Sequence, residues 1–266
     1  MGDRLKGKVS IVVGGGQSPG QTVGNGRAAA ILFAREGARV MLVDSRLESA
    51  QETQAMIEQE GGQAFSFQAD ITREEDCRRI PEQCIERWSR IDVLHNNVGI
   101  GERGKGLMEM PKAEWQRFMD VNVAGLYLTC KYVVPHMIRQ ESGVVINISS
   151  VAAVISMRAL AYKSSKAAVN AFTQGLALEV ARYGVRVNAI MPGLMETPMA
   201  IEQRMRAWNV AREEVVQPRN EQVPLKGGMG SGWDVGHAAV FLASEEARFI
   251  TGVLLAVDGG QAAKVG

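Results

Sequence analysis

The first forty residues contain the pattern that most constrains the fold: a strand, a glycine-rich turn and a helix. Val9–Val13 is a β-branched run typical of a buried strand. Glycines follow at positions 14, 15, 16, 20, 24 and 26, and Ala28–Glu36 then resembles a helix that ends at Gly37. Glycine lets the backbone approach a pyrophosphate, and a helix N-terminus offers unpaired N–H groups. The stretch therefore predicts a phosphate-binding unit; the alternative is a glycine-rich surface loop.

A second buried strand, Arg39–Val43, ends at an acidic residue. Asp44 lies about 20 residues past the glycines, where a carboxylate can accept a hydrogen bond from an adenosine ribose hydroxyl. It would repel a 2′-phosphate, so Asp44 favours NAD over NADP, although Arg46 lies close enough to weaken that preference. The alternative role for Asp44 is to cap the next helix.

Strands and helices then alternate to the end of the chain, without a linker or a repeat. The pattern predicts a single-domain α/β fold over residues 1–266, with a doubly wound parallel (Rossmann-type) sheet and helices on both faces. The expected helices after the first are Leu47–Gln59, Arg73–Trp88 with a break or kink near Pro81, Ala113–Arg139, the helix of Tyr162, and Trp233–Ala243. The expected further strands are Ala64–Gln68, Ile91–His95, Val144–Ile148, Val185–Met191 and Val253–Val257.

Two segments fall outside this alternation. The glycine-containing loop Ile100–Met110 is expected to be mobile. An insertion at about 194–225 mixes apolar residues with many charges, and from residue 198 it is interpreted as a short helix pair that covers a substrate cleft.

Tyr162 and Lys166 lie four residues apart at the start of one helix. Positions i and i+4 share a helix face, so both side chains can point into one cleft. A nearby cation favours the phenolate and lowers the pKa of a tyrosine towards the range useful in acid–base catalysis. A serine at the end of the preceding strand could hydrogen-bond a carbonyl or alcohol oxygen. The alternative is a surface pair without a function.

Composition excludes several classes of function. The net charge is +1 without a basic block, so no nucleic-acid partner is expected. The cysteines, Cys77, Cys84 and Cys130, form no Cys-x-x-Cys pair, which favours free thiols in a reducing compartment, the cytoplasm. The histidines lack ligand spacing, so no metal site is expected. No signal peptide is expected, and no apolar run approaches the ~18 residues of a membrane span.

Taken in order, these motifs resemble those of the short-chain dehydrogenase/reductase family, from about Leu5 to Gly260. The matching motifs are Gly24-Asn25-Gly26, Asp70, Asn96-Asn97-Val98-Gly99, Asn122, Ser149-Ser150, Tyr162-x-x-x-Lys166, Pro192-Gly193 with Thr197, and Val257-Asp258-Gly259-Gly260. The resemblance implies an oxidoreductase in which Tyr162 is the general acid/base and Lys166 holds the nicotinamide ribose and lowers the tyrosine pKa. It also implies that Asn122 supports a water-linked proton relay, and that Ser150 positions the substrate oxygen, with Ser149 as the other candidate.

The resemblance also assigns the cofactor contacts. Asp44 would meet the adenosine ribose, Asp70 the adenine and Asn97 the region near the ribose, while Thr197 and the backbone near Met195 would fix the carboxamide. The implied cofactor-binding set is Gly14, Gly16, Gly24, Asn25, Gly26, Asp44, Asp70, Ile71, Asn97, Val98, Gly99, Tyr162, Lys166, Pro192, Gly193, Met195 and Thr197.

The substrate is expected to be a small alcohol or ketone. Predicted substrate contacts are Ser150, Ala152, Tyr162, Met199, Met205 and Trp208, and the predicted pocket wall adds Ala153, Ile155, Met157 and Met195. Methionine-rich walls adapt to irregular apolar ligands, so a hydrophobic or cyclic alcohol is expected.

Three departures from the family pattern concern the cofactor. Val13 replaces a threonine, and the glycine turn is longer than usual. Its insertion, roughly Gln17–Thr22, would wrap the phosphates with Ser18 or Thr22, or reach a neighbouring subunit. Asn25 replaces an apolar residue of Gly-x-Gly, and Val98 replaces an alanine.

The sequence therefore predicts an NAD-dependent oxidoreductase for a secondary alcohol or ketone. The alternatives are an NADPH-dependent carbonyl or 3-oxoacyl thioester reductase and, in another class, a non-catalytic NAD-binding scaffold or sensor. The resemblance also implies a homo-oligomer, most often a tetramer, built from the helices around Leu107–Arg139 and Ala161–Tyr183 and the C-terminal strand.

Overall fold

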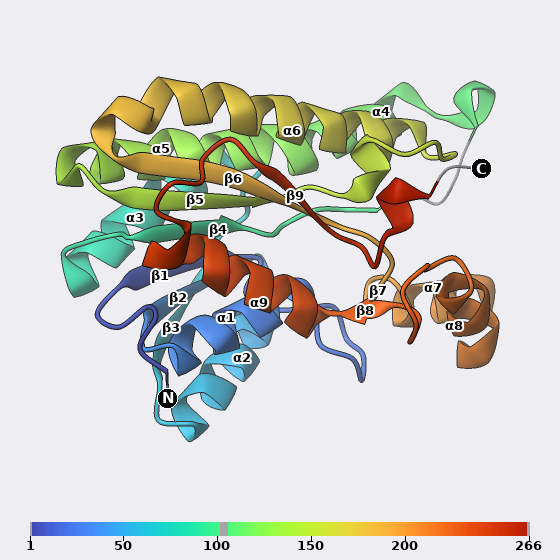
Figure 1. The fold of residues 1–266 in the computed structure, drawn as a ribbon, viewed down its shortest axis with the longest axis horizontal. Helices are drawn as coiled ribbons and strands as arrows, with labels where there is room; N and C mark the ends of the chain where they lie inside the picture. Colours follow the sequence, from blue (N-terminus) through green and yellow to red (C-terminus); the bar gives the residue numbers. More distant parts are fainter. Residues whose placement is uncertain (1, 102–105, 265–266) are drawn as a thin grey trace.

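A parallel sheet of seven strands forms the centre of the computed structural model, which describes residues 2–101 and 106–264 (Figure 1). The order is β3-β2-β1-β4-β5-β6-β9, and every neighbouring pair is parallel. The strands are β1 (Val9–Val13), β2 (Arg39–Asp44), β3 (Gln63–Gln68), β4 (Val93–Asn96), β5 (Gly143–Ile148), β6 (Val185–Pro192) and β9 (Leu254–Val257). The predicted doubly wound parallel sheet is confirmed.

Strand β1 lies at the point where the strand order reverses. Its register places Val13 between Val43 of β2 and Asn96 of β4. All five of its residues are buried, because helices cover both faces of the sheet. Ligands of open parallel sheets bind beyond the carboxyl ends of the strands at such a reversal.

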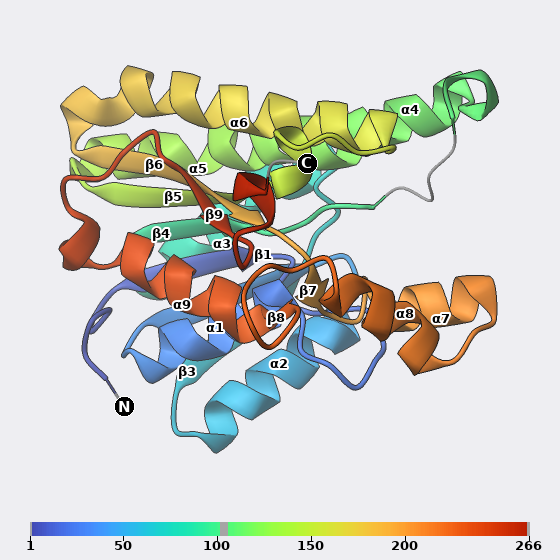
Figure 2. The ribbon, with the colours of Figure 1, turned by 45° about the vertical axis from the view of Figure 1, so that its right-hand side comes forward.

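Helices cover the two faces of this sheet (Figures 1 and 2). On one face, α1, α2 and α9 bury a core around Phe33, Leu42 and Ile57. On the other, α3, α5 and α6 bury a core that includes Ile80 and Met137. The bounds are α1 (Asn25–Arg35), α2 (Leu47–Gln59), α3 (Glu74–Trp88), α5 (Gly125–Gln140), α6 (Leu160–Val180) and α9 (Gly232–Ala243).

Helix α3 runs unbroken through Pro81, so the predicted break does not occur. Its buried side chains, which include Ile80 and Cys84, pack in the core beneath the sheet. Burial of large apolar side chains contributes about 1.5–3 kcal/mol each, enough to offset the hydrogen bond that a proline removes.

The predicted long helix over 113–139 is divided by a π-helical turn. Helix α4 covers Lys112–Met119, the π turn covers Asp120–Ala124, and α5 follows without a gap. Such wider turns occur frequently at functional sites. Asn122 lies within this turn and is buried.

The predicted helix pair of the insertion consists of α7 (Glu202–Trp208) and α8 (Arg212–Asn220). They lie at one end of the molecule, between the short strands β7 (Met195–Glu196) and β8 (Gly230–Ser231) (Figure 2). A small core around Ile201 and Val215 holds them together. We call α7, α8 and their connection, residues 198–225, the covering segment.

The predicted mobile loop falls partly on residues 102–105, which lie outside the described residues. Beyond them, Leu107–Glu109 forms a short 3-10 helix. Within the two described ranges, no helix combines the length and the apolar character needed to cross a membrane.

Candidate active site

One large cleft, of about 1350 Å³, opens at the carboxyl ends of the sheet strands and extends beneath the covering segment. Most of the predicted site residues line it. They are Gly14, Gly16, Gly24, Asn25, Gly26, Asp44, Asp70, Ile71, Asn97, Val98, Gly99, Ser150, Ala152, Tyr162, Lys166, Pro192, Gly193, Met195, Thr197, Met199 and Trp208. Strand ends that are far apart in sequence therefore supply one continuous surface.

The glycine turn begins at Gly14, whose φ of +81° is one that residues with a Cβ rarely adopt. A Cβ on Gly26 would lie 2.0 Å from the Gly14 carbonyl oxygen, so α1 can approach the turn this closely only with glycine there. Helix α1 begins at Asn25, three residues before the expected start, after the cap residue Gly24. First-turn amides of a helix have no intrahelical partner, so this end of α1 suits a phosphate.

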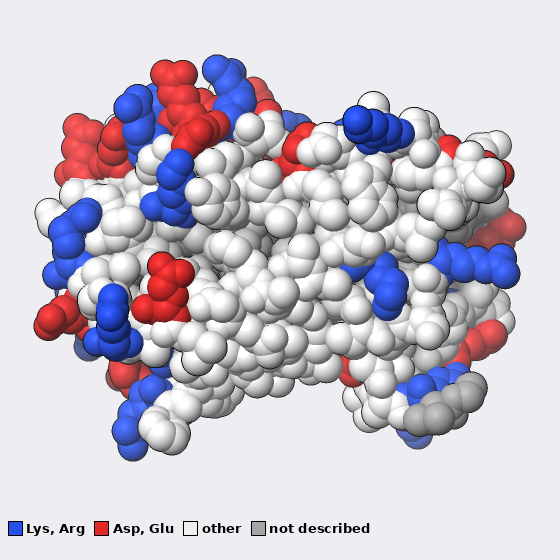
Figure 3. Space-filling model, turned by 90° about the horizontal axis from the view of Figure 1, so that it is seen from above, with Lys and Arg blue, Asp and Glu red and all other residues white. Residues whose placement is uncertain are grey.

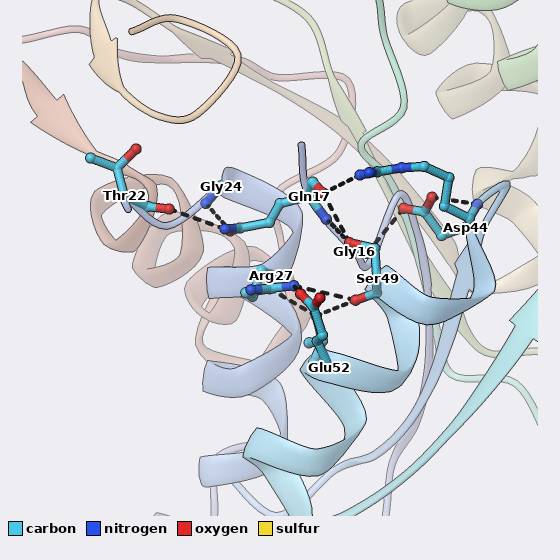
Figure 4. A network of polar contacts seen from close by, with 10 residues as sticks. Gly16, Gln17, Thr22, Gly24, Arg27, Asp44, Ser49 and Glu52 are labelled. Carbon is cyan, nitrogen blue, oxygen red and sulfur yellow. Dashed lines mark hydrogen bonds and ion pairs between the residues drawn. The ribbon is translucent and has the colours of Figure 1, made fainter. Parts of the chain in front are cut away.

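The insertion in the glycine turn is anchored at Gln17 (Figure 4). The Gln17 amide donates to the Ser49 hydroxyl over 2.8 Å, and that hydroxyl donates to the Gln17 carbonyl over 2.9 Å. The Gln17 side chain donates to the Thr22 carbonyl and accepts from the Gly24 amide. These bonds close residues 17–24 into a loop attached to α2.

The outer part of the same insertion contacts the covering segment. The Thr22 hydroxyl donates to the Glu202 carboxylate over 3.2 Å, and Ser18 accepts from Gln203 over 3.2 Å. Arg206 donates to the Pro19 carbonyl. Ser18 and Thr22 therefore bind α7 of their own chain. That the insertion wraps the phosphates with Ser18 or Thr22, or reaches a neighbouring subunit, stays a prediction; Ser18 also lines the cleft.

Asp44, the last residue of β2, lines the cleft beside the glycine turn. Its carboxylate accepts from the Gly16 amide over 3.1 Å and from the Arg46 amide over 3.0 Å. The Arg46 guanidinium donates to the Gln17 carbonyl. Asp44 thus faces the glycine turn at the end of β2, and Arg46 also lines the cleft.

Two further strand ends contribute polar groups. Asp70 follows β3, and its carboxylate accepts from the amide and hydroxyl of Thr72. Asn97 follows β4 and donates to the Gly14 carbonyl over 3.3 Å. A Cβ on Gly14 would lie 3.0 Å from Val98, so the larger side chain at this position packs directly against the glycine turn.

Ser150, Tyr162 and Lys166 converge at the other end of the cleft. Lys166 is buried, and its ammonium donates to the Ile148 carbonyl over 2.9 Å while lying 5.9 Å from the centre of the Tyr162 ring. Burial lowers the pKa of Lys166 to about 8. Lys163 donates to the Ala152 carbonyl and supports the loop that leads from Ser150 to α6.

The expected lowering of the Tyr162 pKa does not occur. Burial raises this pKa, and a hydrogen bond with Ser150 and the charge of Arg204 lower it by less, so the net shift is upward. Lys166 is not among the causes of this shift. Desolvation of the phenolate therefore outweighs the nearby cations.

The two serines differ in geometry. Ser149 donates to the Lys166 carbonyl over 3.0 Å and thereby holds the backbone of α6. Ser150 hydrogen-bonds with Tyr162, donates to the Pro192 carbonyl over 3.4 Å and accepts from the Ala152 amide. Ser150 is therefore the serine whose hydroxyl lies beside the phenol.

Asn122 lies behind the cleft and does not line it in the described structure. Its side chain accepts from the Ile100 amide over 2.8 Å and donates to the Ile100 carbonyl and the Ser165 hydroxyl. A Cβ on Gly99 would lie 3.1 Å from the Lys166 ammonium and 3.3 Å from the Asn122 oxygen. Asn122 thus fixes the loop that passes next to Lys166.

The apolar wall differs from the expected one at two positions. Ile155, Met157, Met199 and Trp208 line the cleft together with Ala152. Met205 instead packs on the small core of the covering segment, and Ala153 also lies outside the cleft lining of the described residues. Neighbouring residues on the short helix α7 face either the cleft or the small core of the covering segment. The sequence alone did not show on which of these two faces Met205 lies.

Four arginines that line the cleft in the described part of the chain were not predicted: Arg117, Arg204, Arg206 and Arg219. Arg204 of α7 and Arg219 of α8 both line the cleft. The covering segment is rich in charges, and a charged side chain on a short helix most often faces solvent. Arg204 lies one helical turn before Trp208, a predicted pocket residue, and this spacing could have indicated it. No comparable signal accompanies Arg219.

The residues at the glycine turn fit a dinucleotide. The oxygen of the Asn25 side chain is buried without a hydrogen-bond partner in the described structure, which suits a ligand that donates at that point. A Cβ on Gly16 or Gly26 would lie less than 3.0 Å from neighbouring protein atoms, so the turn packs this closely only with glycine, and the Asp44 carboxylate accepts from the Gly16 amide beside it. Among the described residues, no group of three or more His, Cys, Asp or Glu could hold a metal ion.

Comparisons with known proteins show which proteins this chain is similar to in sequence and in fold. Residues 21–262 match a family model described as enoyl-(acyl carrier protein) reductase. The chain is 38% identical over 263 residues to 3beta-hydroxysteroid dehydrogenase 1 of Eggerthella lenta. The aligned region covers 98% of this chain and 95% of that protein. A putative short-chain dehydrogenase/reductase from Burkholderia xenovorans superposes with a TM-score of 0.92 at 36% identity, over 99% of this chain and 100% of the other. Carveol dehydrogenase from Mycobacterium avium, solved in complex with NAD, has a TM-score of 0.90 at 26% identity, with 98% and 100% covered.

Proposed function

Since the chain belongs to the short-chain dehydrogenase/reductase family and is an oxidoreductase, we propose that it interconverts a secondary alcohol and a ketone with NAD. The observation that carries the proposal is the convergence of Ser150, Tyr162 and Lys166 at one end of the cleft, with the glycine turn and Asp44 at the other. This spacing suits a dinucleotide whose nicotinamide lies beside Tyr162.

Each residue at the reacting end has a separate role. Bound NAD supplies the hydride acceptor. The Ser150 hydroxyl orients the substrate oxygen, and the Tyr162 phenol exchanges a proton with that oxygen. Lys166 places a cation 5.9 Å from the centre of the Tyr162 ring and holds the nicotinamide ribose. We retain Asn122 as a support for the proton relay, through its hold on the loop at Gly99.

The remaining cofactor contacts follow the strand ends. We propose that Asp44 accepts from the adenosine ribose, that Asp70 lies at the adenine, and that Asn97 lies near the ribose. Thr197, together with the backbone near Met195, would fix the carboxamide. Asp44 supports NAD over NADP because a carboxylate repels a 2′-phosphate.

The test removes the phenol without changing the shape of the cleft. Tyr162→Phe should lower kcat by about 10²–10⁴-fold, the usual contribution of one acid–base group, while calorimetry shows unchanged NAD affinity. Tyr127→Phe, at an exposed position on α5, is the matched control and should keep wild-type turnover. Unchanged turnover in Tyr162→Phe would sink the mechanism.

The second candidate is an NADPH-dependent carbonyl or 3-oxoacyl thioester reductase. The observation that favours it is Arg46, which lines the cleft next to Asp44 and has its guanidinium at the glycine turn. Titration with NADP and NAD separates the two candidates, since a lower Kd for NADP would give this alternative first place. A non-catalytic scaffold is disfavoured because Tyr162 and Lys166 are both retained.

We also propose that the protein forms a homo-oligomer, as a tetramer, through the face that carries α5 and α6. Figure 3 shows this face from above, with uncharged side chains over most of its middle. Tyr127, Leu160 and Leu178 are exposed apolar residues on these helices. Sedimentation equilibrium tests the oligomeric state.

We place the protein in the cytoplasm, because Cys77, Cys84 and Cys130 are free thiols.

A further inference from the structure

Three arginines of the covering segment, Arg204, Arg206 and Arg219, line the cleft. Arg206 is exposed and donates to the Pro19 carbonyl, whereas Arg204 and Arg219 are partly buried and lack a counter-charge among the described residues. The Arg204 guanidinium donates to the Ala200 carbonyl over 2.7 Å and stands 5.9 Å from the centre of the Trp208 ring. Arg219 contacts the Met229 sulfur over 3.2 Å. Neither forms an ion pair with a carboxylate in the described ranges, whereas the nearby Arg212 pairs with Glu196.

Both guanidiniums are partly buried, and their charges act on each other. Burial and, to a smaller extent, the charge of Arg204 together lower the pKa of Arg219 to about 10. Burial also lowers the pKa of Arg204, while Tyr162 raises it. Glu202, a possible partner in the same helix, directs its carboxylate to Gln21 and Thr22 instead. Unpaired charges removed from water are unfavourable, so an anion between them would be stabilised.

The position of this pair identifies the part of the ligand that it meets. Arg204 and Arg219 line the same cleft as Tyr162, and the charges of Arg204 and Tyr162 act on each other, which assigns Arg204 to the reacting end. A planar guanidinium matches a carboxylate through two parallel hydrogen bonds. We propose that the substrate is a secondary alcohol or ketone that carries a carboxylate, held by Arg204 and Arg219.

This inference rests on the proposed function and specifies its substrate class as a hydroxy acid or keto acid. In the oxidation, the C–H bond of the carbinol breaks and its electron pair leaves as hydride to oxidised NAD. The hydroxyl proton passes to Tyr162, and the C=O bond forms. The carboxylate stays intact and ionised throughout. The apolar wall from Ile155 to Trp208 would enclose the carbon skeleton between the two ends.

The test compares each acid with its neutral ester. The probes are 4-hydroxycyclohexanecarboxylate and 3-hydroxybutanoate, each with its methyl ester, under NAD. We expect wild-type kcat/KM to favour the acids, and Arg219→Met to lower the acid-to-ester ratio by about 30-fold or more, mainly through KM for the acid. The ratio cancels any general effect of a variant on folding or proton transfer. Arg219→Lys should retain part of the preference.

Lys226→Met is the matched control, because it removes the same charge from an exposed position of the segment that follows α8, outside the cleft lining of the described residues. It should leave the ratio unchanged. If Arg204→Met and Arg219→Met both keep the wild-type ratio, the inference is overturned.

A binding measurement separates this inference from the proposed function. Calorimetry with cyclohexanecarboxylate and cyclohexanecarboxamide, added to the protein saturated with NADH, does not depend on turnover. If the wild type binds the carboxylate and Arg219→Met does not, the anion site is supported. If in addition no alcohol is oxidised, only the proposed function is rejected. Turnover of esters without a carboxylate preference rejects the inference alone. An equal loss of NADH affinity in Arg219→Met would assign the pair to the cofactor phosphates and overturn the inference.

Discussion

Glu202 of α7 accepts hydrogen bonds from both the amide and the hydroxyl of Thr22, each over 3.2 Å, and so joins the covering segment to the glycine turn. The Gln21 amide donates to the same carboxylate over 3.0 Å. One carboxylate therefore links the covering segment to the glycine turn, the two segments that we propose to enclose the substrate and to hold the cofactor. The residues that lengthen the glycine turn supply the donors of this contact.

Removing this carboxylate should weaken both sites together. Glu202→Ala leaves the Gln21 and Thr22 amides without their acceptor, which should lower the free energy of unfolding by about 1–3 kcal/mol. The Kd for NAD and the KM for substrate should rise together. Glu202→Gln should restore part of the effect, and Glu213→Ala, an exposed change on α8, should have none. A change confined to one ligand would contradict the link.

The contribution of Glu202 should also depend on pH. Burial raises its pKa, but hydrogen bonds from its own amide and from Thr22 and Gln21 outweigh burial, and the net pKa lies below the ordinary 4.5. The stabilisation is therefore present above pH 4.5 and is lost as the pH falls through the lowered pKa. Urea unfolding of wild type and Glu202→Gln across this range should show the two curves converging in acid.

Asp44→Asn should shift the cofactor preference. The amide still offers an acceptor to the Gly16 amide but no longer repels a 2′-phosphate. Because juxtaposed like charges cost several kcal/mol, NADP affinity should rise by about tenfold or more. Glu48→Gln, at an exposed position in the first turn of α2, is the control. Unchanged relative affinity, measured by calorimetry, would show that Asp44 does not decide the preference.

Arg204→Met should move the pH profile of oxidation. The charge of Arg204 lowers the pKa of Tyr162, so its removal raises that pKa. Since oxidation needs the deprotonated phenol, the rising limb of kcat against pH should move to higher pH for a neutral alcohol. Lys226→Met should leave the limb in place. A shift to lower pH would rule out this electrostatic relation.

His95→Leu should make the protein less sensitive to acid. His95 is fully buried beside Phe33, neither ring nitrogen has a hydrogen-bond partner in the described structure, and burial lowers its pKa to about 3. Between about pH 6.5 and 3 the unfolded chain therefore binds a proton that the folded chain does not, and stability falls as the pH falls.

The measurement for His95 is urea unfolding at pH 7 and pH 5. From pH 7 to pH 5, the stability of His95→Leu relative to wild type should increase by about 2 kcal/mol. His237→Gln, an exposed position on α9, should show no such increase. Parallel pH dependence in His95→Leu and wild type would mean that this imidazole does not control acid stability.

Much of the fold could be predicted because the physical signals are local. The β-branched run Val9–Val13 and the Leu47–Gln59 helix were predicted with their observed bounds. The π turn around Asn122 was missed, because helical spacing looks the same on either side of one widened turn. The break predicted near Pro81 is absent from α3. A proline costs a helix one hydrogen bond, and the sequence shows this local cost but not the packing that offsets it.

The sequence by itself determined which chemical groups this protein has and the order of the elements that carry them. Periodicity of 2 and 3.6 residues decides strand and helix, and strand ends then bring Asp44, Asn97 and Ser150 to one edge of the sheet. Only the tertiary structure decided the partners of each side chain: Thr22 binds Glu202, and the charge of Arg204 acts on Tyr162. These contacts join residues that are far apart in the chain. The burial of the side chains involved shifts their pKa values, and no local sequence pattern encodes that burial.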